Sequence, residues 1–202
     1  MKNVAVLLSG RGSNFLALSD AVETGEISAR ISLVISNRKE APGLDHARDR
    51  GYETVYLPSK GIDRESYDRL VSAELGKAAI DIVCLAGFMR ILGPTLIREF
   101  PNRILNIHPS LLPSFPGLNA QGQALDRGAK VTGCTVHFVD EEVDHGLIIL
   151  QHPVPILNDD TEESLSERIL VYEHDIYKRA LKWVCEDKIR TVNRRVILPE
   201  EE

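Results

Sequence analysis

Short apolar runs alternate with amphipathic stretches through the first half of this chain. The apolar runs are rich in Val, Ile and Leu, which is typical of buried strands. We expect strands over residues 4–8, 31–35, 54–57 and 81–85, and helices that start near Ser13 and cover residues 41–50 and 63–78, the last capped by Asp63. This alternation predicts an α/β fold: a mostly parallel, twisted sheet with helices on both faces and ligands at the carboxyl ends of its strands.

The second half continues the pattern and ends in one long helix. Residues 161–186 carry apolar side chains at helical spacing, which predicts a helix packed on the sheet. Further strands are expected over residues 104–108, 132–139 and 147–154, with a short helix over residues 120–127. His137 and His152 on these strands are expected to be packed or solvated. We expect residues 1–188 to form a single domain and residues 189–202 a solvated C-terminal tail.

The strand at residues 104–108 delivers two polar side chains to one side of the chain. Asn106 and His108 are two residues apart, so an extended backbone points both side chains the same way. Pro109 keeps His108 out of the helical region and gives the imidazole a rigid mount. A paired polar site at a strand end is one interpretation. The other is a proline-rich surface turn with an incidental histidine.

The loop after His108 leaves two questions open. Either isomer of the Leu112–Pro113 peptide bond is compatible with the sequence. Ser110 suggests a hydrolase nucleophile near His108, but the Gly-x-Ser-x-Gly elbow that presents such a serine is missing. A serine hydrolase is therefore disfavoured.

Four carboxylates crowd into the turn at residues 140–144. Taken alone, this cluster suggests a solvated turn. If the preceding strand lies beside that of His108, however, one carboxylate reaches the imidazole. Asp144 is the candidate, because it is the carboxylate nearest Gly146, where the chain tightens. Glu173, on the long helix, needs a ligand to be more than a surface residue.

A glycine-rich loop at residues 9–14 joins the first strand to a helix. Such a junction presents free backbone N–H groups and the positive end of the helix dipole to a phosphate, and Arg11 can add charge. Phe15 stands where a dinucleotide fingerprint needs its third glycine, and Ser36-Asn37 replaces the usual acidic residue, which disfavours NAD. A triphosphate loop is disfavoured because Gly-Lys-Ser/Thr is missing. A phosphate monoester site or a merely tight turn remains.

The loop at residues 86–92 is unusually apolar for a strand end. One interpretation is a pocket for a flat ring, with Arg90 available for an anionic part of the ligand. The other is core packing beneath the helix that begins near Pro94. Arg90 favours the pocket.

Composition narrows the class of partner and the compartment. The net charge of −6 argues against nucleic acid and anionic membranes, which need a dominant cationic field. Three widely spaced cysteines suggest neither a disulfide framework nor a metal site, and therefore reduced thiols. The apolar N-terminal run is too short for a signal peptide, and no segment is long enough to span a bilayer. We expect a cytoplasmic protein.

Three ordered motifs together resemble the folate-dependent formyltransferases. They are Asn106-Ile-His108-Pro-Ser-Leu-Leu-Pro, Gly133-Cys-Thr-Val-His137-Phe-Val and Val143-Asp144-His-Gly146, and the resemblance runs from Asn3 to about Trp183. The loop Gly10-Arg-Gly12-Ser13-Asn14 is similar to that of members that use glycinamide ribonucleotide. The resemblance implies a Rossmann-like formyltransferase fold. It also implies transfer of the formyl group of 10-formyltetrahydrofolate, a cosubstrate, to the amine of that ribonucleotide in purine synthesis, without a metal.

The same resemblance assigns site residues. The implied catalytic group is Asn106, His108 and Asp144. Gly12, Ser13, Asn14 and Glu173 are implied to bind the acceptor. The folate side is implied to be lined by Arg64, Met89, Arg90, Ile91, Leu92, Asn106, Asp140, Glu141, Val143 and Asp144.

Two departures and several alternatives accompany this resemblance. Family members commonly have His where Gln121 stands, and Lys or Gln where Leu170 stands, so acceptor binding is expected to differ more than the chemistry. A formyltetrahydrofolate hydrolase is disfavoured because it usually carries an extra N-terminal domain. A methionyl-tRNA formyltransferase is disfavoured because it needs a C-terminal domain and a basic surface. A non-catalytic folate-binding module also stays open, and so does the choice between monomer and homodimer.

Overall fold

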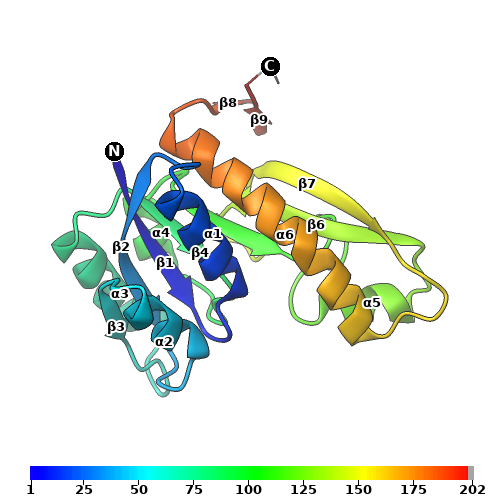
Figure 1. Cartoon of the computed structure of the whole chain (residues 1–202), viewed down its shortest axis with the longest axis horizontal. Coiled ribbons are helices and arrows are strands. Elements are labelled where there is room, and N and C mark those ends of the chain that lie inside the picture. Colours follow the sequence, from blue (N-terminus) through cyan, green and yellow to red (C-terminus); the bar gives the residue numbers. More distant parts are fainter. Residues whose placement is uncertain (200–202) are drawn as a thin grey trace.

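A seven-stranded sheet forms the centre of the computed structural model, which describes residues 1–199 (Figure 1). The strand order is β3-β2-β1-β4-β5-β6-β7. The strands are β1 (Lys2–Leu8), β2 (Ala29–Ser36), β3 (Thr54–Tyr56), β4 (Ile82–Leu85), β5 (Ile104–His108), β6 (Val131–Phe138) and β7 (Ile148–Pro155). β1 to β5 pair in parallel, whereas β6 and β7 pair antiparallel, so the predicted mostly parallel sheet is confirmed.

Helices cover both faces of this sheet, as the alternating pattern predicts. They are α1 (Ser13–Glu23), α2 (Pro42–Asp49), α3 (Arg64–Lys77), α4 (Pro94–Glu99), α5 (Ala120–Asp126) and α6 (Glu162–Cys185). One apolar core lies under α1, α2 and α6, and a second lies under α3 and α4. Figure 1 shows α6 running across the sheet from α5 towards the C-terminal end of the chain.

Side-chain caps mark the start of two helices. The carboxylate of Asp63 accepts a hydrogen bond from the Ser66 amide over 2.9 Å at the start of α3, as expected. At the start of α6, Thr161 and Ser164 form a reciprocal capping box. These caps satisfy backbone groups that a helix end otherwise leaves without partners.

The C-terminal segment is more ordered than a solvated tail. It forms a hairpin of β8 (Arg190–Val192) and β9 (Arg195–Ile197). Val196 and Leu198 are partly buried against the larger core, and the Arg194 guanidinium reaches His145 Nε2 at 3.3 Å. The three arginines of the segment are exposed, as expected of a solvated segment, while the hairpin and the two partly buried residues give it a fixed course.

Ser9 joins three strand ends at the edge where ligands are expected. Its backbone amide donates to the Gly87 carbonyl over 3.1 Å, and its hydroxyl donates to Asn37 Oδ1 over 2.6 Å. The same hydroxyl accepts from the Met89 amide over 2.8 Å. The carboxyl ends of β1, β2 and β4 are therefore tied together, and the loop after β4 has a fixed course.

Candidate active site

Asn106 and His108 lie at the end of β5, which pairs with β6. In the antiparallel register Asn106 is opposite His137, and His108 is opposite Thr135. Asn106 Nδ2 lies 3.1 Å from His137 Nε2. Both polar side chains lie at the end of a strand, as predicted, and their role as a paired site stays a prediction. His137 is buried, so the expectation that it is packed is confirmed, and its ring contacts Asn106.

Both ring nitrogens of His108 face acceptors. Nε2 lies 2.9 Å from the carbonyl oxygen of Phe115, and Nδ1 lies 3.4 Å from Asp144 Oδ2. The residue is only 5% exposed, so bulk water does not compete for these positions. A carbonyl and a carboxylate are both acceptors, so the ring lies between two groups that can receive a hydrogen bond.

Asp144 reaches the histidine from the turn after β6. Its backbone is left-handed, with φ 53°, and its side chain is 10% exposed. Oδ2 also accepts from the Gly117 amide over 2.7 Å. Of the carboxylates in the turn, the one chosen from its place near Gly146 is therefore the one that lies beside His108.

A buried hydroxyl cluster holds the loop that follows His108. Thr135 Oγ1 donates to the Ser110 carbonyl over 2.6 Å and accepts from the Leu112 amide and from Gln151 Nε2. Ser110 Oγ donates to the Ser114 carbonyl and lies at a longer 3.3 Å from the Phe115 carbonyl. Ser110 and Thr135 are both fully buried. The Ser110 hydroxyl is thus bound within the loop that contacts His108, which is a structural role and not that of a nucleophile.

The glycine loop ends at the first turn of α1. Gly12 has φ +81°, and a Cβ placed there would lie 2.8 Å from the Cα of Gly43. None of the side chains within residues 1–199 caps this helix, so the amides of its first turn are available to an anion. The loop therefore needs glycine at this position, and its role as a phosphate cradle stays a prediction.

Glu173 is buried next to that cradle. It is 8% exposed, and Asn14 Nδ2 donates to its Oε2 over 2.8 Å. Burial raises the pKa of the Glu173 carboxyl, and the hydrogen bond from Asn14 opposes part of this rise. Asn14 Oδ1 is buried and has no hydrogen-bond partner in the described part of the chain. The expectation of a surface Glu173 is wrong, because α6 turns this residue inward.

The apolar loop after β4 divides between solvent and core. Met89 is 59% and Ile91 48% exposed, whereas Leu92 is 4% exposed and belongs to the core under α3 and α4. Core packing is therefore confirmed for Leu92, and the pocket for a flat ring stays a prediction for the exposed residues. Arg64, the first residue of α3, is exposed, and its stem lies beside the buried Gly93.

Arg90 points inward. Its guanidinium donates to the carbonyls of Ser59 and Ile62 over 3.0 and 2.6 Å and lies 4.4 Å from the ring centroid of Tyr67. The expectation that it meets an anionic ligand gains no support from this geometry. Two carbonyls and an aromatic face outcompete solvent for the cation, and the result is a braced loop.

The acidic turn has further partners outside the site. Asp140 Oδ2 lies 2.9 Å from His145 Nδ1, and Glu141 Oε1 lies 2.9 Å from Arg98. Val143 is 51% exposed. The turn is thus paired with its own His145 and with Arg98 of α4. It points Asp144 inward and leaves Val143 exposed.

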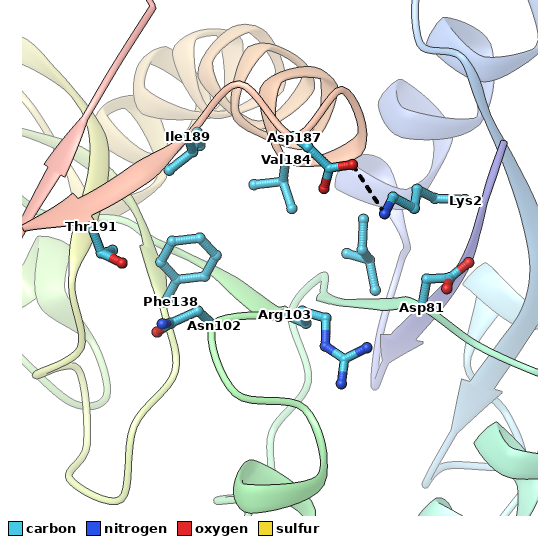
Figure 2. A pocket seen from close by; sticks show the side chains of 10 residues that line it. Lys2, Asp81, Asn102, Arg103, Phe138, Val184, Asp187, Ile189 and Thr191 are labelled. Atoms are coloured by element: carbon cyan, nitrogen blue, oxygen red, sulfur yellow. Dashed lines mark ion pairs between the residues drawn. The ribbon is translucent and has the colours of Figure 1, made fainter.

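A separate cavity of about 170 Å³ lies at the other end of the parallel strands, where β1 and β4 begin, near the end of α6 (Figure 2). Its charged groups have partners within the protein. Lys2 pairs with Asp187 over 3.2 Å, and Arg103 donates to the Glu99 carbonyl. This cavity is a weaker candidate for catalysis than the strand ends, where Asn, His and Asp converge.

Other chemistry is sparse in the described residues. Among residues 1–199, no group of three or more His, Cys, Asp or Glu side chains is placed to hold a metal. Cys84, Cys134 and Cys185 are free and buried, and burial raises the pKa of the Cys134 thiol to about 12. Within the same range, no helix is long and apolar enough to cross a membrane.

Comparison with known proteins gives a consistent result. The chain matches the formyl transferase family over residues 2–181. Phosphoribosylglycinamide formyltransferase of Escherichia coli is 43% identical over 189 residues, which are 93% of this chain and 89% of that protein. The crystal structure of glycinamide ribonucleotide transformylase 1 from Symbiobacterium toebii has a TM-score of 0.96 at 47% identity, covering 98% of this chain and 95% of that chain.

A longer relative contains the same unit. The trifunctional purine biosynthetic protein adenosine-3 of Drosophila melanogaster is 50% identical over 183 residues. These residues are 89% of this chain but only 14% of that protein, so the chain spans a small part of its length.

The fold and site define an α/β protein with a cluster of Asn, His and Asp side chains at the strand ends of a Rossmann-like sheet. The chain belongs to the formyl transferase family, and the resemblance seen in the motifs is confirmed.

Proposed function

We propose that this chain transfers the formyl group of 10-formyltetrahydrofolate to the amine of 5′-phosphoribosylglycinamide, with Asn106, His108 and Asp144 as the catalytic group. This activity is that of a phosphoribosylglycinamide formyltransferase, a one-carbon group transferase of de novo purine synthesis. The folate is a cosubstrate that is consumed in each turnover. The observation that carries the proposal is the contact of His108 Nδ1 with Asp144 Oδ2 at 3.4 Å, beside Asn106 on the same strand.

Formyl transfer requires stabilisation of one negative charge and movement of one proton. The acceptor amine attacks the formyl carbon, a new C–N bond forms, and the carbonyl oxygen becomes an oxyanion. The bond from carbon to the folate nitrogen then breaks, and a proton from the amine passes to that leaving nitrogen. Preorganised donors aimed at the oxyanion lower the barrier, because they need no rearrangement as the charge develops.

Asn106 and His108 supply these donors. Asn106 donates through its amide nitrogen. His108 donates through Nδ1, because Nε2 is already bound to the Phe115 carbonyl, and the 3.4 Å contact of Nδ1 with Asp144 is longer than an ordinary hydrogen bond and leaves its hydrogen available to the oxyanion. Asp144 favours the protonated ring by charge attraction and, through a water molecule, helps the proton move between the two substrate nitrogens. No covalent nucleophile takes part in this sequence.

The acceptor binds between α1 and α6. The amides of Gly12, Ser13 and Asn14 hold its phosphate, because the first turn of α1 offers donors and a positive dipole end. Glu173 binds its hydroxyl or amine donors. A buried carboxylate with one hydrogen bond has acceptor capacity left for such a partner.

The folate binds along the loop after β4 and the acidic turn. Met89 and Ile91 offer exposed apolar contact for the pterin ring, which suits a flat heterocycle. The remaining lining residues are Arg64, Arg90, Leu92, Asp140, Glu141 and Val143, with Asn106 and Asp144 shared with the catalytic group. Arg90 acts by bracing the loop, and Leu92 contributes its backbone.

The test is the absorbance change on folate release, measured with and without the ribonucleotide. Turnover only with the ribonucleotide is the expected result. Turnover without it would make the protein a hydrolase that uses water as the acceptor. Folate binding without turnover in either case would leave a binding module and would overturn the proposal.

Compartment and assembly complete the proposal. The three free, buried cysteines are compatible with the reducing cytoplasm, where we place the protein. We take the functional unit to be a monomer or a homodimer that binds small molecules only. Sedimentation velocity at two protein concentrations tests the assembly, and a species larger than a dimer would contradict it.

A further inference from the structure

His137 is a buried histidine that the catalytic group does not include. It lies on β6 and is 2% exposed. We propose that His137 is a positioning residue for formyl transfer, which orients the Asn106 amide so that its nitrogen, and not its oxygen, faces the developing oxyanion. This inference rests on the proposed role of Asn106.

The first step of the argument is the tautomer of His137. Its Nδ1 lies 2.8 Å from the carbonyl oxygen of Phe138. A carbonyl only accepts, so Nδ1 carries the hydrogen in this contact. Burial lowers the pKa of the His137 imidazole, which favours the neutral ring. A neutral ring with hydrogen on Nδ1 has a lone pair on Nε2.

The second step is the orientation of Asn106. His137 Nε2 lies 3.1 Å from Asn106 Nδ2. Since Nε2 is an acceptor, it needs a donor, and the amide nitrogen is the only donor that an asparagine side chain has. The contact therefore fixes which end of the amide faces β6.

The third step is the consequence for the reaction. An amide nitrogen carries two hydrogens, so one is bound to His137 and the other remains available to the oxyanion. If the amide rotates by half a turn, Oδ1 faces the reacting oxygen and repels its charge. His137 excludes that orientation, because two acceptors would then face each other.

His137 does not act directly on the substrate in this arrangement. Its Nε2 is engaged by Asn106, and the ring is almost fully buried. Asp144 Oδ1 lies 3.8 Å from His137 Nε2, which is too long for a hydrogen bond. The effect of the ring on turnover therefore passes through Asn106.

A double-mutant cycle tests this path. His137→Phe keeps a ring of similar size but removes the acceptor, and His137→Gln retains an oxygen near the position of Nε2. We expect His137→Phe to lower kcat by roughly 10- to 100-fold, somewhat less than the loss of a whole oxyanion donor. KM for either substrate should change less than about twofold, and His137→Gln should recover most of the loss. His46→Gln, on the exposed surface of α2, is the control for histidine replacement and should leave kcat unchanged.

The same replacements in an Asn106→Ala background decide the mechanism. If His137 acts only through Asn106, His137→Phe should lower kcat less than about twofold there. An equal loss in both backgrounds, or a rise in KM as large as the fall in kcat, would overturn the inference. An Asn106→Ala variant with full activity would instead remove the proposed role of Asn106, and an inactive native protein would remove the proposed function.

Two further measurements apply if His137→Phe does not fold. His137→Asn can satisfy the Phe138 carbonyl but is too short to reach Asn106, so it should show the loss of kcat expected for His137→Phe. His137→Gln should remain active. Equal kcat values of His137→Asn and His137→Gln would count against the inference. Nitrogen-15 NMR of the native protein should show His137 neutral with hydrogen on Nδ1, and a ring with hydrogen on Nε2 would also overturn it.

Discussion

Asn14 and Glu173 are separated by 159 positions in the sequence, yet the Asn14 amide donates to Glu173 Oε2 over 2.8 Å inside the protein. The bond joins the first turn of α1 to the middle of α6, where the acceptor is proposed to bind. Glu173 is thus a buried carboxylate next to the proposed phosphate cradle. The charged carboxylate is proposed to bind the acceptor, but its burial lowers the stability of the folded protein at neutral pH.

Glu173→Gln should weaken acceptor binding and stabilise the free protein at neutral pH. Burial raises the folded pKa of Glu173 above its ordinary value of 4.5, so stability is fully present below that value and is lost as pH rises through the folded pKa. Gln carries no such penalty. Its melting temperature should exceed that of the native protein at pH 8 but match it near pH 4. In a chain of this size, about 1 kcal/mol corresponds to roughly 2–4 °C. An equal difference at both pH values would contradict this account.

His108→Ala should abolish most turnover while the acceptor still binds. The ring contributes a donor at the reacting oxygen, and its loss should lower kcat by roughly 10²- to 10⁴-fold. Calorimetric titration with the ribonucleotide should give a Kd within about twofold of the native value. A complete loss of binding would mean that His108 positions substrate instead.

Asp144→Asn should lower kcat and move its pH dependence. The amide oxygen of Asn can still accept from the Gly117 backbone, so the loop should stay in place while the charge next to His108 disappears. We expect a loss of roughly 100-fold in kcat and a changed pH dependence of kcat, because a charged group beside the imidazole is lost. An unchanged profile would argue against the pairing of these two residues.

Thr135→Val should loosen the support beneath His108. The substitution keeps the volume but leaves the Leu112 amide and the Gln151 side chain without a shared acceptor in a buried place. Each such loss costs about 1–3 kcal/mol. Chemical denaturation should report the loss of stability, and Thr135→Ser, which keeps the hydroxyl, should restore most of it. Equal stability of the two variants would show that the hydroxyl contributes nothing.

Gly12→Ala should impair folding and acceptor affinity together. It places a side chain in a left-handed backbone and within 2.8 Å of the Gly43 Cα. Gly25→Ala is a matched control, because Gly25 has φ +79° but nothing within 4 Å of its Cβ position. Left-handed backbone alone costs about 1–2 kcal/mol. Gly12→Ala should therefore melt at a lower temperature than Gly25→Ala, because only the former brings a side chain against α2. Equal melting temperatures would show that this contact has no effect on stability.

The sheet and most helices follow from local patterns in the sequence. Central parallel strands are buried on both faces, so β1 and β4 appear as unbroken apolar runs. Asp63 signals the start of α3, and its carboxylate does cap that helix. The hairpin at 190–197 was missed because its strands are only three residues long and mostly exposed, so they leave no buried apolar run in the sequence.

The site was predictable where neighbours in the sequence are neighbours in space. Asn106 and His108 share a strand, and Asp144 follows the strand that pairs with it. His137 was missed because its contact with Asn106 depends on the register between β5 and β6, which the alternation of side chains does not fix. The inward course of Arg90 depends on carbonyls at Ser59 and Ile62, some 30 residues earlier, and no local signal announces them.

The pairing of Asn106 with His137 is part of the sheet itself, since the two residues face each other across β5 and β6. These strands lie inside the sheet, between β4 and β7. Such strands are among the last parts of a domain to open. Amide hydrogens of β5 should therefore exchange with solvent only when the whole domain unfolds. Heating should likewise abolish the donor pair when the sheet is lost, and not earlier through the loosening of a surface loop.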